Sequence, residues 1–287
     1  MPEALIWVNG QLVPAGMPAL DPRDRGFLLA DGLYEVVRVR RGRAVALPLH
    51  LARLAQGAAL LALPLPPGLE AAVMETIAAN QLEEGMVRLV VSRGVASQRG
   101  LLPAGDESPT VVIQALSYRP PSPELYQRGV AAIVSSLRRN ERSPLTQVKS
   151  LAATEQVLAR MEAARQGYPE AILLNTRGQV AGATAANLFA VVDGTVLTPP
   201  AAEGALPGIL RQRLLSEVAP ACGVPATSAP LPLARLIAAQ EAFLTSVLIG
   251  ILPLTNLAGQ PIGRGQPGPV TRQLAATLAD NDCHPLG

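Results

Sequence analysis

The sequence predicts a two-domain protein, an α+β domain followed by an α/β domain, and three observations carry this prediction. Two hairpin patterns follow one another within the first 50 residues, which favours an antiparallel sheet. A proline-rich segment at 118–124 then interrupts the chain, because prolines at this density exclude both helix and strand ladder. Beyond it, strand and helix patterns alternate, as they do in α/β domains. We therefore expect an N-terminal domain at 1–117, a linker at 118–124 and a C-terminal domain at 125–287.

The first domain combines hairpins with helices. Asn9-Gly10 lies between two apolar runs, an arrangement typical of a tight hairpin turn. A polar loop with several Gly and Pro residues, at 95–109, is long enough to be a working loop. In chain order we expect strands at 5–8, 11–13, 33–39 and 44–47, helices opening at 49–54 and at about 69–80, and strands at 86–94 and 110–115.

The second domain contains the clearest helix pattern of the chain. Residues 151–164 are rich in Ala, Leu, Glu and Arg and contain neither Gly nor Pro, which favours a helix. Further strands are expected at 129–134, 171–175, 185–192, 241–245 and 249–254, and further helices near 209–218, 233–238 and 269–279.

Composition excludes several classes of protein. The 287 residues are 49% hydrophobic, enough for the cores of two domains. Lys and Arg total 24 against 22 acidic residues, and the arginines are scattered, so no electrostatic case for nucleic acid arises. The longest apolar stretch is interrupted by prolines and cannot span a membrane.

The termini and cysteines favour a cytoplasmic protein. The first residues lack the basic region and apolar run of a signal peptide. Cys222 and Cys283 form neither a disulfide framework nor the spacing of a metal site, which suits a reducing compartment, and no metal is expected.

Lys149 stands at a predicted junction between a strand and a helix. A lysine there has its stem in apolar surroundings and its amine near a helix start, and both effects disfavour the ammonium form. A lone lysine is more often a surface residue, so the neighbouring motifs decide the interpretation. They include a strand at 171–175, a turn at 176–178, a strand at 185–192 and the run from Leu206 to Arg211.

Taken in this order, the motifs resemble the fold-type IV pyridoxal-phosphate enzymes. That family includes D-amino-acid and branched-chain aminotransferases and 4-amino-4-deoxychorismate lyase. The resemblance covers nearly the whole chain. It implies the fold of a D-amino-acid aminotransferase, pyridoxal 5'-phosphate in a cleft between the domains, a small-molecule substrate and a homodimer.

The resemblance assigns the residues that hold the cofactor. Lys149 matches the Schiff-base lysine, which binds the aldehyde and shuttles a proton at the substrate carbon. Arg53, in a His-Leu-x-Arg-Leu motif, matches the phosphate arginine. Two further segments match the family's phosphate-binding turns and supply the remaining predicted ligands, namely Gly208, Ile209 and Leu210 at a helix start, with Ser246 and Val247 in a second turn.

Substrate contacts are predicted in the first domain. The run Asp31-Gly32-Leu33-Tyr34-Glu35 resembles a family signature whose side chains face the substrate, so Tyr34 is predicted to bind it. Arg99, in the 95–109 loop, is the candidate partner of a substrate carboxylate.

A few residues distinguish the lyases of the family from its aminotransferases. Leu210 and Val247 replace the threonines usual in aminotransferases, and the 185–187 and 155–158 segments also resemble the lyases. We therefore expect a lyase that releases pyruvate and yields 4-aminobenzoate for folate synthesis. The 34–37 segment resembles D-amino-acid aminotransferases instead, so an aminotransferase acting on a D- or branched-chain amino acid is the alternative.

Two departures from the family pattern concern the cofactor ring. Gly182 stands where most members have the glutamate that pairs with the protonated pyridine nitrogen. Ala152 and Ala153 replace an Asn and often a Tyr that contacts the ring. The losses allow three interpretations: a reaction that depends less on a strong electron sink, a different acid in the same place, or a non-catalytic homologue that binds the cofactor poorly.

Overall fold

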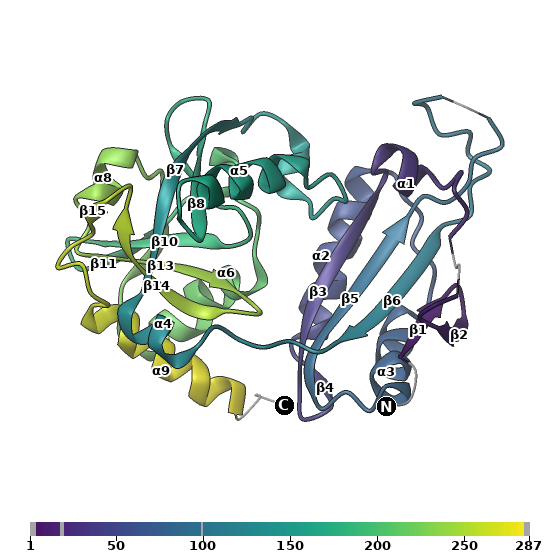
Figure 1. The fold of residues 1–287 in the computed structure, drawn as a ribbon, viewed down its shortest axis with the longest axis horizontal. Coiled ribbons are helices and arrows are strands. Elements are labelled where there is room, and N and C mark those ends of the chain that lie inside the picture. The colour runs from purple at the N-terminus through teal and green to yellow at the C-terminus, as the bar shows by residue number, and fades with distance from the viewer. Residues whose placement is uncertain (1–3, 18–19, 99, 284–287) are drawn as a thin grey trace. The chain divides into compact units, whose positions relative to one another are not determined.

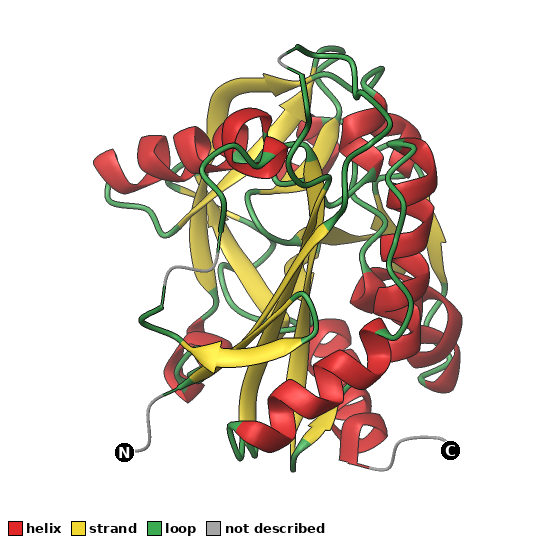
Figure 2. Cartoon of the chain, turned by 90° about the vertical axis from the view of Figure 1, so that its right-hand side faces the viewer, coloured by secondary structure: helices red, strands yellow, loops and turns green. Residues whose placement is uncertain are grey.

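A computed structural model describes residues 4–17, 20–98 and 100–283, shown as a ribbon in Figure 1. The chain divides into two compact units. Unit 1 comprises Met1–Arg119 and Val148–Ala152, and unit 2 comprises Pro120–Gln147 and Ala153–Gly287. The chain mixes strands with helices (Figure 2), and each unit contains both. This confirms the predicted two-domain α and β class.

Unit 1 is built on a six-stranded antiparallel sheet in the order β2-β1-β6-β5-β3-β4. Its strands are β1 (Leu5–Val8), β2 (Gln11–Pro14), β3 (Gly32–Arg40), β4 (Arg43–Ala44), β5 (Glu84–Ser92) and β6 (Thr110–Leu116), and its helices are α1 (Arg25–Leu29), α2 (Leu47–Leu60) and α3 (Leu69–Ala79).

The core of unit 1 lies between one face of this sheet and the helices α2 and α3 (Figure 1). Burial alternates along β3, so Leu33, Glu35, Val37 and Val39 are buried while Tyr34, Val36 and Arg38 are only partly covered. Leu54 of α2 and Val73 of α3 belong to the same cluster. The alternation leaves the second face of β3 and β5 to carry partly exposed side chains.

The segment that carries Lys149 joins unit 1, although we expected it in the domain at 125–287. The backbone N–H of Tyr34 donates to the Lys149 carbonyl at 2.9 Å, and the N–H of Leu151 donates to the Gly32 carbonyl at 3.0 Å. Ser150 forms an isolated antiparallel bridge with Leu33. These hydrogen bonds to the start of β3 place the segment in unit 1, although it lies within the sequence of unit 2.

Unit 2 contains a nine-stranded mixed sheet in the order β12-β11-β10-β13-β14-β7-β8-β9, with β15 paired to β14. Its strands are β7 (Val130–Arg139), β8 (Glu170–Asn175), β9 (Val180–Ala183), β10 (Asn187–Val192), β11 (Thr195–Thr198), β12 (Ala226–Ser228), β13 (Glu241–Ser246), β14 (Gly250–Leu257) and β15 (Gln260–Pro261). Its helical segments are α4 (Pro123–Arg128), the 3-10 turn η1 (Pro144–Gln147), α5 (Thr154–Arg165), the 3-10 turn η2 (Ala201–Glu203), α6 (Ile209–Arg213), the π-helix η3 (Leu214–Val218), α7 (Ala219–Ala221), α8 (Leu233–Ile237) and α9 (Pro269–Cys283).

Strands β8 and β10 are almost wholly buried, as their continuous apolar runs predict. Phe189 and Phe243 stack on neighbouring strands with ring centroids 5.0 Å apart. The helix predicted from residue 151 begins at Thr154, because Ser150 and Leu151 are tied to β3. Within the described ranges, none of the helices combines the length and apolar character needed to cross a membrane.

Candidate functional site

Lys149 and Tyr34, predicted from separate motifs, meet on the second face of the unit 1 sheet. The Lys149 Nζ atom lies 4.1 Å from the centroid of the Tyr34 ring. The guanidinium carbon of Arg88 lies 4.4 Å from the same centroid. In the β3–β5 register Val36 pairs with Arg88 and Tyr34 with Val90, so Tyr34 and Arg88 share a face. The Lys149 amine and the Arg88 guanidinium therefore both lie against the Tyr34 ring.

Two features of this face were missed from the sequence. Lys149 is the only lysine among the 287 residues, so a cofactor bound through a lysine has one attachment point. Arg88 alternates with the buried Val87 and Leu89 in β5, and that period-two pattern could have placed it with Tyr34. No carboxylate forms an ion pair with Arg88 within the described part of the chain, so its charge is available to a substrate.

Glu35, the next residue of β3, points to the opposite, helix-covered face. It is 1% exposed and binds two side chains of α2. Its carboxylate accepts hydrogen bonds from Arg53 Nε at 2.8 Å and Arg53 Nη2 at 2.6 Å, and contacts His50 Nδ1 at 2.7 Å. Burial works to raise the pKa of Glu35, but the hydrogen bonds from His50 and Arg53 outweigh it and hold that pKa below its usual value.

This arrangement bears on the predicted phosphate role of Arg53. In the structure Arg53 binds Glu35 through Nε and Nη2, so its position is fixed by the protein itself. Its contact with a phosphate stays a prediction. His50 is fully buried and contacts the Glu35 carboxylate.

Unit 2 forms a close-fitting cradle around Gly208. A Cβ atom on Gly208 would lie 1.9 Å from Asn187 Oδ1, so no larger residue fits without displacement. Asn187 Nδ2 in turn donates to the Leu206 carbonyl at 2.8 Å. Asn187 pairs in the sheet with Thr245, whose buried hydroxyl has no hydrogen-bond partner in the part of the chain that is described. A buried hydroxyl without a partner fits a site that receives a ligand.

A helical segment starts at this cradle. It runs without interruption through α6, η3 and α7, from Ile209 to Ala221, with Gly208 at its N-cap position. The first backbone N–H groups of a helix have no partner inside it and attract anions. Ile209 and Leu210 bury their side chains in the core, at 4% and 5% exposure, so only their backbone can meet a phosphate.

The second predicted phosphate turn lies between β13 and β14. Ser246 is partly buried, and its hydroxyl accepts a hydrogen bond from the Ile249 N–H at 3.4 Å. Val247 follows it in the turn. Thr245, immediately before Ser246, was not predicted, although it presents the unpartnered hydroxyl described above.

Where the family's glutamate would stand, the chain has Gly182, with backbone close by. A Cβ atom on Gly182 would meet only the Ala186 carbonyl oxygen, at 3.3 Å, within 4 Å. Gly182 has a φ of +153°, a conformation that L-residues rarely adopt, so a glutamate introduced here would be strained. The residues therefore fit the phosphate end of pyridoxal phosphate, but offer no carboxylate at this position.

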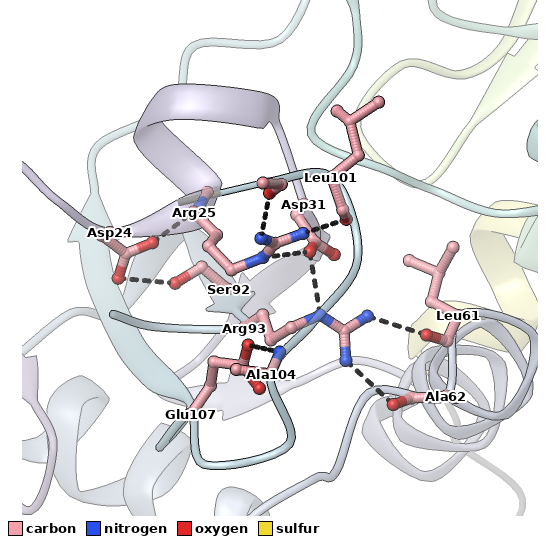
Figure 3. Close-up of polar contacts among 12 residues, drawn as sticks. Asp24, Arg25, Asp31, Leu61, Ala62, Ser92, Arg93, Leu101, Ala104 and Glu107 are labelled. Atoms are coloured by element: carbon pink, nitrogen blue, oxygen red, sulfur yellow. Dashed lines mark hydrogen bonds and ion pairs between the residues drawn. The ribbon is translucent and has the colours of Figure 1, made fainter. Parts of the chain in front are cut away.

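A charged network holds the 95–109 loop of unit 1 (Figure 3). The Asp31 carboxylate pairs with Arg25 at 2.9 Å and with Arg93 at 2.8 Å. Arg25 donates to the carbonyls of Gly100 and Leu101 at 2.9 and 2.8 Å. Burial would raise the pKa of Asp31, yet hydrogen bonds from Arg93 and Arg25 lower it. Arg99, the predicted substrate ligand, lies outside the described residues.

Comparison with known proteins identifies the family of the chain. The model of the family described as amino-transferase class IV matches residues 32–257. D-alanine aminotransferase from Listeria innocua is 34% identical over 274 residues, covering 94% of this chain and 93% of that protein.

Solved structures give the same result. The 4-amino-4-deoxychorismate lyase from Pseudomonas aeruginosa is 35% identical with a TM-score of 0.85, covering 96% of this chain and 99% of that one. The branched-chain amino acid aminotransferase from Escherichia coli is 26% identical with a TM-score of 0.90, covering 97% of this chain and 94% of that one.

The chain therefore belongs to the class IV aminotransferase family, which confirms the resemblance drawn from the motifs. Like its relatives, it is an enzyme that depends on pyridoxal phosphate.

Proposed function

We propose that the protein is a pyridoxal-phosphate-dependent lyase that releases pyruvate from 4-amino-4-deoxychorismate and leaves 4-aminobenzoate. The observation that carries the proposal is the 35% identity to the Pseudomonas aeruginosa lyase across 99% of that chain. The apolar Leu210 and Val247, where aminotransferases usually have threonine, agree with it. The product would serve folate synthesis, and the cytoplasm is the proposed location.

The bound cofactor supplies an electron-accepting ring. Lys149 Nζ would hold the cofactor by its aldehyde carbon and would move the proton at the substrate carbon. Tyr34 lies against the Lys149 amine and limits its orientations. Arg88, beside the same ring, is proposed to bind a substrate carboxylate, because a guanidinium can form two parallel hydrogen bonds with one. Arg99 is proposed to bind a second carboxylate.

At the phosphate end, the backbone N–H groups of Ile209 and Leu210 and the Thr245 hydroxyl are the proposed donors. Ser246 and Val247 would close the same site from the β13–β14 turn, and Arg53 would add positive charge. Because Gly208 has no side chain, the backbone there could approach the anion closely. A side chain at this position would also collide with Asn187.

The second candidate is an aminotransferase for D-amino acids. The 34% identity to D-alanine aminotransferase from Listeria innocua favours it, as does the Tyr34–Val37 segment. The two functions differ in stoichiometry. A lyase forms pyruvate from one substrate, whereas an aminotransferase needs an amino acid and a 2-oxo acid together.

The test of both is a paired assay. Pyruvate release from 4-amino-4-deoxychorismate without an added 2-oxo acid is the expected result. Amino transfer from D-alanine to 2-oxoglutarate without lyase turnover would reject the lyase and select the alternative.

Because Lys149 is the only lysine, the attachment point can be tested by chemistry. Reduction of the loaded enzyme with borohydride should add one pyridoxyl group to the peptide that contains Lys149, as measured by mass spectrometry. Lys149→Ala should lose the visible absorbance band, the adduct and at least about a thousandfold in turnover. An adduct on another residue, or a band that survives in Lys149→Ala, would refute the assignment.

We further propose that the enzyme is a homodimer. Phe27 and Leu28 of α1 are 75% and 59% exposed, and Leu101 and Leu102 of the loop bound by Arg25 are 83% and 87% exposed. An apolar group of this size on a soluble protein commonly marks an interface. Light scattering should give twice the 29.9 kDa mass of the chain, and a monomer mass at micromolar concentration would exclude the dimer.

A further inference from the structure

Arg139, at the end of β7 in unit 2, is a buried cation without a matching anion. It is 9% exposed, and its Nε atom has no hydrogen-bond partner in the described part of the chain. No carboxylate among these residues lies within ion-pair distance of it. Burial lowers the pKa of Arg139, while the more distant charge of Glu155 opposes that shift. Buried charges are costly unless they are paired, so this side chain is suited to meet a ligand.

Arg139 lies close to the strand in which the family's glutamate is missing. The Arg139 Cδ atom and the Ala181 Cβ atom lie 3.6 Å and 3.7 Å from the point that a Cβ on Gly204 would occupy. Ala181 directly precedes Gly182 in β9. A Cβ atom on Gly182 would lie 3.3 Å from the Ala186 carbonyl oxygen.

Three other buried carboxylates of this unit are already engaged. Glu170 binds Arg160 at 2.6 Å, Glu203 binds Arg177 at 2.7 Å, and Glu141 also pairs with Arg177, at 3.5 Å. None of these three forms an ion pair with Arg139.

We propose that Arg139 faces the pyridine-nitrogen end of the bound cofactor and keeps that nitrogen unprotonated at neutral pH. This inference rests on the proposed function only in requiring that pyridoxal phosphate binds. A guanidinium can donate a hydrogen bond to an unprotonated ring nitrogen, but it repels a protonated one. A single positive charge within several ångströms is enough to lower the pKa of the nitrogen by ~1 unit or more.

The consequence is a weaker electron sink than in relatives with a glutamate. With a neutral nitrogen the bound ring would withdraw electrons less strongly than with a protonated one. Arg139 would thus determine which reactions the loaded enzyme performs well, and it counts as a cofactor-binding residue that sequence motifs do not reveal.

The test measures the nitrogen directly. Pyridoxal phosphate labelled with 15N in the ring is bound to the enzyme, and its nitrogen chemical shift is followed from pH 6 to pH 9. The wild-type protein should show the shift of an unprotonated pyridine throughout. Arg139→Gln should raise the pKa of the nitrogen by ~1 unit or more, and Arg139→Lys, which keeps the charge, should restore the wild-type titration.

Arg138→Gln is the matched control. Arg138 neighbours Arg139 in β7, but its Nη1 atom donates to the carbonyls of Ser135 and Ser136 at 2.6 and 3.2 Å. Its removal should leave the nitrogen unchanged. A protonated nitrogen at pH 7 in the wild-type enzyme, or equal titrations of wild type and Arg139→Gln, would overturn the inference. A protein that takes up no cofactor would refute the proposed function as well, and the absence of visible absorbance distinguishes that result.

Discussion

Glu35 in unit 1 and Arg139 in unit 2 are both buried charges, but only one of them is compensated by the chain. Glu35 binds Arg53 and His50 through three contacts of 2.6 to 2.8 Å. Arg139 has a buried Nε atom for which the described residues provide no partner. Burial of a charge alone therefore does not define a functional site. A buried charge that is paired within the protein stabilises the fold, whereas one without a partner is available to bind a ligand.

The same contrast separates the two sets of site residues. In unit 1 the Lys149 segment, Tyr34 and Arg53 are held by backbone pairing and ion pairs within the protein. In unit 2 the Thr245 hydroxyl and Arg139 have polar atoms that lack partners among the described residues. The Lys149 segment, Tyr34 and Arg53 are thus already fixed by the protein, whereas the Thr245 hydroxyl and Arg139 present donors that a ligand would satisfy.

Removing the charge of Glu35 should have the greatest effect on stability. Glu35→Gln removes a charge that binds two cationic or potentially cationic side chains, and it should lower the free energy of unfolding by about 3 kcal/mol, as loss of a buried ion-pair partner does. Urea denaturation of the apo protein measures it. Glu84→Gln, which removes the exposed partner that Arg38 of β3 has on β5, should cost less than about 1 kcal/mol. Equal losses in the two variants would contradict the distinction.

A smaller effect follows from pH. The pKa of Glu35 is lowered in the folded protein, so its contribution to stability is complete above the unfolded value near 4.5 and is lost as pH falls through the folded value. The difference in unfolding free energy between wild type and Glu35→Gln should therefore be constant from pH 7 to about pH 5. It should shrink below pH 4.5, by about 1.4 kcal/mol for each unit of pKa shift. If the difference in unfolding free energy grew on acidification, the predicted direction of the Glu35 pKa shift would be wrong.

Replacing Arg139 in the apo protein should change stability least. Arg139→Met replaces an uncompensated buried cation by an apolar side chain, and it should change the unfolding free energy by less than about 1 kcal/mol or raise it. The same substitution should reduce the stabilisation that added pyridoxal phosphate gives in a thermal melt. A loss of several kcal/mol without cofactor would mean that Arg139 is compensated by the protein after all.

Much of unit 1 could be predicted from local pattern. The Asn9-Gly10 turn and the alternation along β3 indicate hairpins and a sheet with one covered face, and both are present. In unit 2, Gly208 was singled out by its motif, and the contact with Asn187 explains why a glycine is needed there. The boundary between the units, after Arg119, falls within the predicted 118–124 linker.

The inventory of chemical groups can be read from the sequence without coordinates: one lysine, at position 149, a glycine at 208 before a helix, and a glycine where relatives carry a glutamate. Which of these groups meet depends on the folded chain. Lys149 lies beside Tyr34 because segments that are far apart in sequence pair through backbone hydrogen bonds. The periodicity of the sequence does not predict this pairing between distant segments. It also does not predict that Arg53 binds a carboxylate, whereas the Arg139 Nε atom has no partner among the described residues. Whether a charge is paired depends on distances in the folded protein.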